Sequence, residues 1–185
     1  MERCPWCLKE QIYIDYHDNE WGIPRYDDKT LFEALLLDGA QAGLSWITIL
    51  KKRENYRSAF DNFDPEKIAN YNDKKITELL NNQGIVRNRL KINSFINNSK
   101  AYLRLIEKNG SLSKILWQFV NNKPIKNSWE LMSQVPTKTK ESDEMSKALK
   151  DAGFNFVGST ICYAFMQAVG MVNDHLASCY RYKEI

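Results

Sequence analysis

The segment "DKKITELLNNQGIVRNRLKINSFINNSKAYLRLIEKNG", residues 73–110, decides the fold class. Two helical runs meet at Gly84. In the second run the apolar residues recur at intervals of three or four, which is the spacing of one helix face: Ile92, Phe95, Ile96, Leu103 and Ile106. The segment therefore predicts a helix, a glycine-centred turn and a long second helix, with the hairpin near residues 79–92.

The rest of the chain shows the same helical periodicity. Asp27 or Asp28 is a candidate cap for a helix in "YDDKTLFEALLLDG", and "GLSWITILKKRENYRSAF" predicts a second helix after scarcely a break. Further helices are predicted in "DPEKIANY", "LSKILWQFV", "SDEMSKALKDAG" and "GSTICYAFMQAVG", with Gly153 and Gly170 as C-terminal stops. The one alternating segment, "IYIDY", is too short to seed a sheet. We therefore expect a compact all-α fold.

Bulk composition limits the classes of protein that the chain can represent. A length of 185 residues, 43% of them hydrophobic, fits one domain over residues 1–185, with room for two lobes. The net charge of +3 permits a polyanionic partner without requiring one. Because there is no apolar run of about 18 residues and no charged-then-apolar leader, we expect no membrane association and a cytoplasmic location. A monomer is the default expectation.

Metal-ligating residues lie near both ends of the chain. His175 and Cys179 stand four residues apart, and on a helix that spacing places both side chains on one face. Structural zinc takes four nitrogen or sulfur ligands, and Cys4, Cys7 and His17 are the candidates for the other two. The pattern predicts a zinc that joins the N-terminal residues to the last helix. The alternative is a buried thiol at Cys179 and an ordinary imidazole at His175.

The turn at Gly84 is also a candidate anion site. In "NNQGIVRNRLK" the helix after the turn opens with Arg87, Arg89 and Lys91. Free backbone N–H groups at a helix start, together with nearby cations, favour phosphate. The element is similar to the helix-hairpin-helix with which many repair proteins hold a DNA backbone. The alternative is a glycine turn beside a solvated basic face.

Aromatic residues gather in the first 46 positions, without helical spacing and interleaved with carboxylates. They are Trp6, Tyr13, Tyr16, Trp21 and Trp46, with Asp38 among them. Such a set can stack a planar ligand and form hydrogen bonds with its edge, and a flipped nucleobase is such a ligand. The alternative interpretation is a small N-terminal core.

Long ordered blocks carry a resemblance that covers nearly the whole chain: "MERC", "YHDNEWG", "QAGLSWITILKKRENYR", "GIVRNRLKI", "PTKT" and "SDEMSKALKDAGFNFVGSTICYAFMQAVGMVNDH". The chain resembles the bacterial 3-methyladenine DNA glycosylase I family. This resemblance implies an all-α helix-hairpin-helix glycosylase fold that flips out 3-methyladenine from alkylated double-stranded DNA and cleaves its N-glycosidic bond. The products are the free base and an abasic site. It also implies one structural zinc on Cys4, His17, His175 and Cys179, which makes Cys7 a spectator.

The resemblance also assigns roles to the other candidate residues. It implies a base pocket lined by Tyr13, Tyr16, Trp21 and Trp46, with Trp6 close by. Asp38 is the catalytic candidate that reads the adenine edge, at a position where the family usually has glutamate; aspartate withdraws the carboxylate by one methylene. We expect the DNA contacts from Gln41, Gly43, Leu44, Gly84, Val86, Arg87 and Arg89, with Gln41 and Leu44 filling the gap left by the flipped base. The alternative for "AQAGLSW" is a joint between two helices.

Two rival interpretations share part of these features. A zinc-stabilised helical DNA-binding protein without catalysis would have the hairpin and the metal, but no use for an aromatic pocket. A thiol oxidoreductase would use "CPWC", residues 4–7, but that motif normally follows a strand, and only three residues precede it here.

Overall fold

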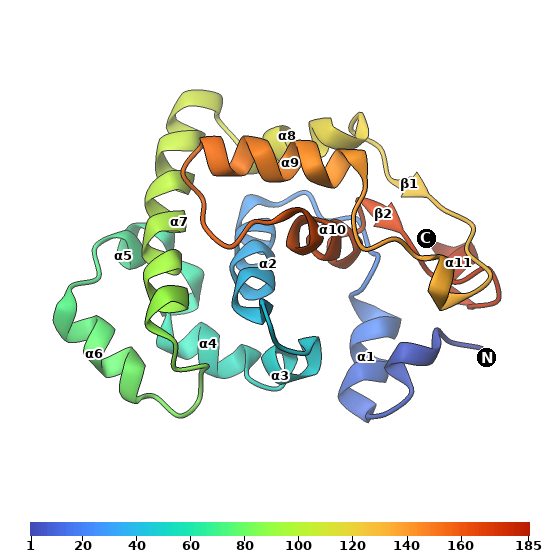
Figure 1. The fold of residues 1–185 in the computed structure, drawn as a ribbon, viewed down its shortest axis with the longest axis horizontal. Helices are drawn as coiled ribbons and strands as arrows, with labels where there is room; N and C mark the ends of the chain where they lie inside the picture. The colour runs from blue at the N-terminus through green and yellow to red at the C-terminus, as the bar shows by residue number, and fades with distance from the viewer.

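The computed structural model describes residues 1–185 and confirms a helical architecture (Figure 1). Its α-helices are α1 (Gln11–Asn19), α2 (Asp28–Gln41), α3 (Trp46–Leu50), α4 (Arg53–Ala59), α5 (Pro65–Ala69), α6 (Asp73–Asn81), α7 (Arg89–Asn109), α8 (Leu112–Trp117), α9 (Lys140–Asp151), α10 (Ser159–Ala168) and α11 (Arg181–Glu184). Two short strands, β1 (Ile125–Lys126) and β2 (Val172–Asn173), pair in parallel. No helix is both long and apolar enough to span a membrane.

The helices enclose one main core. In Figure 1, α2 and α10 lie at the centre, α7 runs along one side and α9 crosses above them. A cluster of 34 buried residues fills this interior, and Phe32, Phe95 and Tyr163 are among its largest members. The hydrophobic stripe of α7 that the sequence predicted therefore faces the core.

A second, smaller core joins the two ends of the chain, which lie near each other in Figure 1. It contains Tyr16 and Trp21 together with Cys4, Leu176 and Cys179. The backbone amide of Tyr180 donates to the carbonyl oxygen of Glu2 at 3.0 Å. The contact between the first and last residues that the sequence predicted is therefore present.

Several predicted helix ends are formed by the expected groups. The Asp27 side chain accepts from the amide of Thr30 at 2.8 Å and caps α2, and Asp64 caps α5 with Pro65 in the first turn. Gly153 and Gly170 adopt the positive φ angles of +95° and +71° that end helices. At Gly170 a Cβ would lie 2.4 Å from backbone atoms of Ile23 and Pro24, so only glycine lets the segment after Trp21 pass this close to α10.

The predicted second helix is wrong in one respect. The segment "GLSWITILKKRENYRSAF" forms two helices, α3 and α4, with a turn at Lys51 and Lys52. The Lys52 ammonium donates to the carbonyl oxygens of Gln83 and Gly84 at 3.0 and 3.3 Å. The turn brings this side chain to the hairpin, a tertiary contact that local periodicity does not show.

The expectation that His175 and Cys179 share a helix is also wrong. Both residues lie in the loop after β2, and α11 begins at Arg181. Pairing of β2 with β1 and a hydrogen bond from the Ala177 amide to the Trp129 carbonyl at 2.8 Å hold this loop in an irregular course. The short alternating segment "IYIDY" belongs to α1, whose two buried residues, Tyr16 and the following His17, are adjacent in the chain and so do not alternate as in a strand.

Candidate functional site

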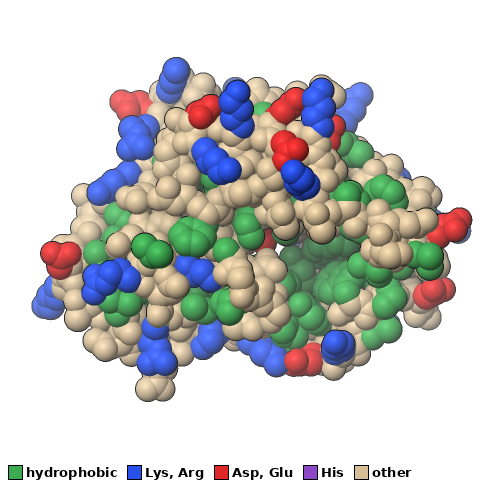
Figure 2. All heavy atoms as spheres, in the orientation of Figure 1, with side chains coloured by type: hydrophobic (Ala, Val, Ile, Leu, Met, Phe, Trp, Pro, Cys, Tyr) green, Lys and Arg blue, Asp and Glu red, His purple; other side chains and the backbone are tan.

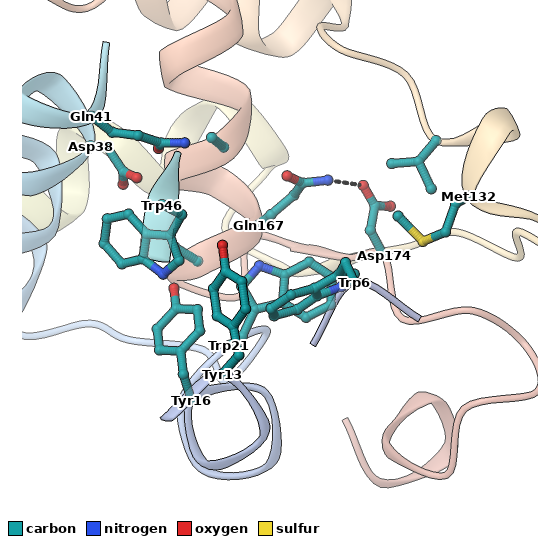
Figure 3. Close-up of a pocket in the computed structure, with 13 residues that line it drawn as sticks. Trp6, Tyr13, Tyr16, Trp21, Asp38, Gln41, Trp46, Met132, Gln167 and Asp174 are labelled. Carbon is teal, nitrogen blue, oxygen red and sulfur yellow. Dashed lines mark hydrogen bonds between the residues drawn. The ribbon is translucent and has the colours of Figure 1, made fainter. Parts of the chain in front are cut away.

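A pocket of about 300 Å³ lies between α1, α2 and α10. Figure 2 shows it as a hollow lined by hydrophobic side chains, to the right of the centre of the molecule. Asp38 and Gln41 line this pocket (Figure 3). All five predicted aromatic residues line it too, namely Trp6, Tyr13, Tyr16, Trp21 and Trp46. The cluster is therefore a cavity wall as well as part of a small core.

The rings support one another mainly by edge contacts. The Trp6 ring lies 5.3 Å from Tyr13 and 5.1 Å from Trp21, both with T-shaped geometry, and Tyr16 lies 5.5 Å from Trp46. The Tyr13 hydroxyl also accepts from the amide of Ile47 at 3.0 Å, which ties α1 to the start of α3. Such packing holds flat apolar surfaces in fixed positions, as a planar ligand requires.

Two residues that line this pocket each have a buried polar atom with no partner in the protein. Asp38, on α2, is only 3% exposed, and its Oδ2 atom makes no hydrogen bond. The indole Nε1 of Trp46 is also buried and unpartnered. Burial without a compensating partner raises the pKa of the Asp38 carboxyl well above its usual range. Unpaired buried groups are rare in native proteins, so a ligand that offers both a donor and an acceptor fits this pocket.

The loop between α2 and α3 lies beside the pocket. Gln41 lines the pocket, Gly43 has a φ of +74°, and Leu44 is exposed to 40% although its side chain is large and apolar. The buried ammonium of Lys91 donates to the carbonyl oxygens of Ala40 and Ala42, each at 2.7 Å. These bonds satisfy the C-terminal carbonyls of α2 and fix the loop to the first turn of α7.

The helix–turn–helix of α6 and α7 has the predicted glycine and arginines. Arg87 and Arg89 are exposed, and the amides of Arg87, Arg89 and Leu90 make no hydrogen bond within the protein. The amide of Val86, however, donates to the Tyr56 hydroxyl at 3.2 Å, so this group is not free. The free donors therefore lie at the start of α7, just after the position that the sequence indicated.

Four buried side chains from the two ends of the chain converge on one point. The ligand atoms of Cys4, His17, His175 and Cys179 all lie within 4.8 Å of one another. The Sγ of Cys179 lies 3.4 Å from Nε2 of His17 and 3.6 Å from Nδ1 of His175, and the Sγ of Cys4 lies 3.7 Å from the same Nδ1. A tetrahedral zinc with Zn–S of about 2.3 Å and Zn–N of about 2.0 Å requires S–N separations of about 3.5 Å, so the four residues fit that ion.

Both histidines are oriented by a second hydrogen bond. Nδ1 of His17 donates to the Asp18 carboxylate at 2.8 Å, and Arg3 holds that carboxylate in turn. Nε2 of His175 donates to the Trp21 carbonyl at 3.2 Å. Such partners set the ring tautomer so that the remaining nitrogen is free to ligate a metal. Cys7 is not part of the cluster, because its thiol donates to the Cys4 carbonyl at 3.1 Å.

Burial also shifts the titration of the ligand groups. It raises the pKa of the Cys4 thiol to about 12 and lowers the pKa of His175 to about 4. Burial therefore favours the neutral form of both groups. A bound divalent cation reverses this preference at the sulfurs, because a metal-coordinated thiol is deprotonated.

Part of the pocket wall comes from residues that were not predicted from the sequence. Met132 and Val135, from the segment before α9, and Ala164, Gln167, Ala168 and Asp174, from α10 and the loop after β2, complete the lining. The α10 segment read as an ordinary apolar helix, and only the polar Gln167 within it was a signal that one face meets a cavity. The loop around Met132 carries no pattern that would reveal its position.

The fold and the pocket define a helical protein with an aromatic cavity of a size and shape suited to a flat heterocycle, with a buried carboxyl on α2 at its wall and a basic hairpin after α6. A family model described as methyladenine glycosylase matches residues 6–182. The chain belongs to this methyladenine glycosylase family.

Individual relatives agree over nearly the full length. The chain is 51% identical over 179 residues to DNA-3-methyladenine glycosylase 1 of Escherichia coli (strain K12), covering 97% of this chain and 96% of that protein. A crystal structure of a 3-methyladenine DNA glycosylase I superimposes with a TM-score of 0.94 at 50% identity, covering 97% of this chain and 98% of that one. A Y16F form of such an enzyme, in complex with 3-methyladenine, gives 0.93 at 39% identity, covering 97% of each chain.

Proposed function

We propose that the protein is a monofunctional DNA glycosylase that excises 3-methyladenine from alkylated double-stranded DNA. The observation that supports this function most directly is the aromatic pocket with an unpartnered acceptor, Asp38, and an unpartnered donor, Trp46. An adenine ring is flat and offers an amino donor and ring-nitrogen acceptors at its edge. Relatives named for this activity, and one solved with 3-methyladenine bound, support the same assignment.

The charge of the substrate explains how such a pocket promotes cleavage. Methylation at the 3-position makes the base in DNA cationic, so the glycosidic bond is weakened and the base leaves as a neutral molecule. Aromatic faces attract the cation, and the Asp38 carboxylate opposite it becomes ionised more readily because an opposite charge favours its anionic form. The pocket therefore favours the damaged base over neutral adenine.

The pocket lining contains no lysine and no thiol, and this composition supports direct hydrolysis. In that reaction water adds to the sugar carbon as the bond to the base breaks, and an abasic site remains. No covalent bond joins enzyme and DNA. Borohydride treatment during turnover tests this step, since a trapped adduct would require a lysine nucleophile.

DNA binding follows from two surfaces of the single domain formed by residues 1–185. We assign the phosphate backbone to Gly84, Arg87, Arg89 and the free amides at the start of α7, a helix-hairpin-helix role that relies on backbone and charge. The exposed Leu44, with Gln41 and Gly43, fills the gap in the duplex once the base has turned out. Because the Val86 amide is already bonded to Tyr56, we assign Val86 a packing role beside this surface.

One zinc ion on Cys4, His17, His175 and Cys179 is the structural cofactor that the donor set fits best. Four protein ligands would complete the coordination of such an ion and leave no position for water or substrate. The ion therefore joins the chain ends and supports α1, which carries Tyr13 and Tyr16 of the pocket wall. We propose that the working enzyme is a zinc-loaded cytoplasmic monomer.

A Trp46→Ala variant distinguishes the glycosylase from a helical DNA-binding protein without catalysis. The glycosylase is expected to lose base release while keeping its salt-dependent affinity for duplex DNA, because phosphate contacts dominate that affinity. Tyr26→Ala is the control, since Tyr26 is 53% exposed and stacks on Trp117 outside the pocket. If the wild-type protein binds DNA and releases no base, the proposed catalysis is refuted.

A further inference from the structure

The base pocket contains a polar pair that the proposed mechanism does not use. Gln167, on α10, and Asp174, in the loop after β2, both line the cavity (Figure 3). Asp174 is only 2% exposed, yet its carboxylate is fully engaged. The Oδ1 atom accepts from Asn127 at 2.7 Å and from the Trp129 indole at 2.8 Å. The Oδ2 atom accepts from the Tyr163 hydroxyl at 2.7 Å and from Nε2 of Gln167 at 2.8 Å.

These bonds fix which way the Gln167 amide faces. Its NH₂ group donates to a carboxylate oxygen, and turning the amide over would place its carbonyl oxygen against that oxygen, acceptor against acceptor. The other three groups around the Asp174 carboxylate donate to it, and the Trp129 indole has no accepting lone pair at all. The orientation is therefore set by chemistry.

The free end of the amide is an acceptor. Oε1 of Gln167 has no hydrogen-bond partner in the protein, and Figure 3 shows it on the side of the amide away from Asp174, toward the open part of the pocket. A ligand in this cavity therefore meets a carbonyl oxygen at this point and not an N–H group.

Asp38 cannot supply the same selectivity alone. Because burial raises the pKa of its carboxyl, a neutral ligand meets a group that can either donate or accept, depending on its proton. Such a group accommodates an amino group and a carbonyl oxygen alike. The Gln167 acceptor has no such freedom.

We propose that Gln167 is a specificity-determining residue whose Oε1 accepts a hydrogen bond from the 6-amino group of 3-methyladenine, and that Asp174 is its positioning residue. This inference rests on the proposed function and adds a reason for choosing adenine over guanine. A 6-oxo purine presents a carbonyl oxygen where the amino group would be, and the two oxygens repel. Rejection by an unsatisfied buried polar group is much stronger than rejection by a missing methylene.

Binding of free bases tests this directly, without DNA or catalysis. The probes are 3-methyladenine and 3-methylhypoxanthine, which carry an amino group and a carbonyl oxygen respectively at the 6-position. Quenching of tryptophan fluorescence in the zinc-loaded protein reports their affinities. The wild type is expected to prefer 3-methyladenine by about 100-fold or more, and Gln167→Met to reduce that preference about tenfold. Gln118→Met makes the same change at an exposed position just after α8. It is expected to leave the preference for 3-methyladenine unchanged.

Asp174→Asn is the second variant, because an asparagine can donate to Gln167 and so lets the amide turn its NH₂ group into the pocket. We expect it to reduce the preference in the same direction, an effect that general loosening of the pocket would not give, since loosening weakens both bases together. If Gln167→Met keeps the wild-type preference while the wild type binds and excises 3-methyladenine, this inference is wrong and the proposed function stands. If the wild type binds neither base and excises none, both are wrong.

Discussion

Replacing Asp38 with asparagine should stabilise the protein and impair the enzyme at the same time. The carboxyl is buried on α2 with no hydrogen bond to Oδ2, and its pKa is raised by burial alone. A folded-state pKa above the unfolded value means that the folded state binds more protons than the unfolded state between the two values. The free energy of unfolding therefore falls as the pH rises through that window.

The magnitude can be bounded from the ordinary pKa of 3.8 for this group. Below that pH, Asp38 costs the folded state no stability through its ionisation. Above it, the loss in the free energy of unfolding grows by about 1.36 kcal/mol for each pH unit until the folded-state pKa is reached. At pH 7 the ceiling is therefore about 4 kcal/mol, equivalent to about 10 °C in Tm for a chain of this length. Asparagine carries no charge and so removes this pH-dependent loss of stability. Burying its amide costs about as much free energy as burying the protonated acid.

Guanidinium unfolding of the zinc-loaded wild type and Asp38→Asn at pH 5 and pH 7 measures the effect, provided that both proteins have the same m value. The amount by which Asp38→Asn raises the free energy of unfolding above that of the wild type should increase by up to about 2.7 kcal/mol from pH 5 to pH 7. Asp151→Asn, at an exposed position near the end of α9, should show no such rise. In the same variant, excision should fall about 10- to 100-fold through loss of a charged hydrogen bond. A stability difference that does not change with pH would refute the assignment of Asp38 as a buried, unpaired acid.

Three further predictions concern the metal, the hairpin and the loop beside the pocket. Cys4→Ser should lose zinc and lower the Tm, whereas Cys7→Ser should keep full zinc by mass spectrometry; equal losses would contradict the ligand set. Arg87→Ala, just before α7, should weaken duplex binding and reduce the slope of log K against log salt by about 1. Lys108→Ala, near the far end of α7 and about 30 Å away, should not; equal slopes would argue against a phosphate contact. Lys91→Met removes two bonds to the end of α2, and excision from duplex DNA should fall more than affinity for free 3-methyladenine. A parallel loss of both would show that the pocket itself has been deformed.

Most of the fold could be predicted from local sequence signals. Asp27, Asp64 and Gly153 end or begin helices by interactions within a few residues, so their roles can be read from neighbouring positions. The break between α3 and α4 could not be predicted from neighbouring positions. It directs the Lys52 side chain to the hairpin, where this side chain contacts residues about 30 positions away in the sequence. The same holds for the loop that contains His175, where strand pairing overrides the four-residue spacing.

The candidate site likewise contains some residues that could be predicted from the sequence and others that could not. Aromatic rings near the N-terminus and the Cys and His residues near both ends are unusual enough in type and position to be found from the sequence. Gln167 and Asp174 were not found, because a polar residue within an apolar helix and an aspartate before a histidine have many ordinary explanations. Their significance depends on a hydrogen bond that only the folded chain forms.

Incubation of the purified, zinc-loaded protein with methylated duplex DNA, followed by chromatography of the released bases, tests most directly whether the protein excises 3-methyladenine. We predict release of 3-methyladenine with little 7-methylguanine, and one abasic site in the DNA for each base released. A folded, zinc-loaded protein that binds the duplex and releases no 3-methyladenine would contradict it.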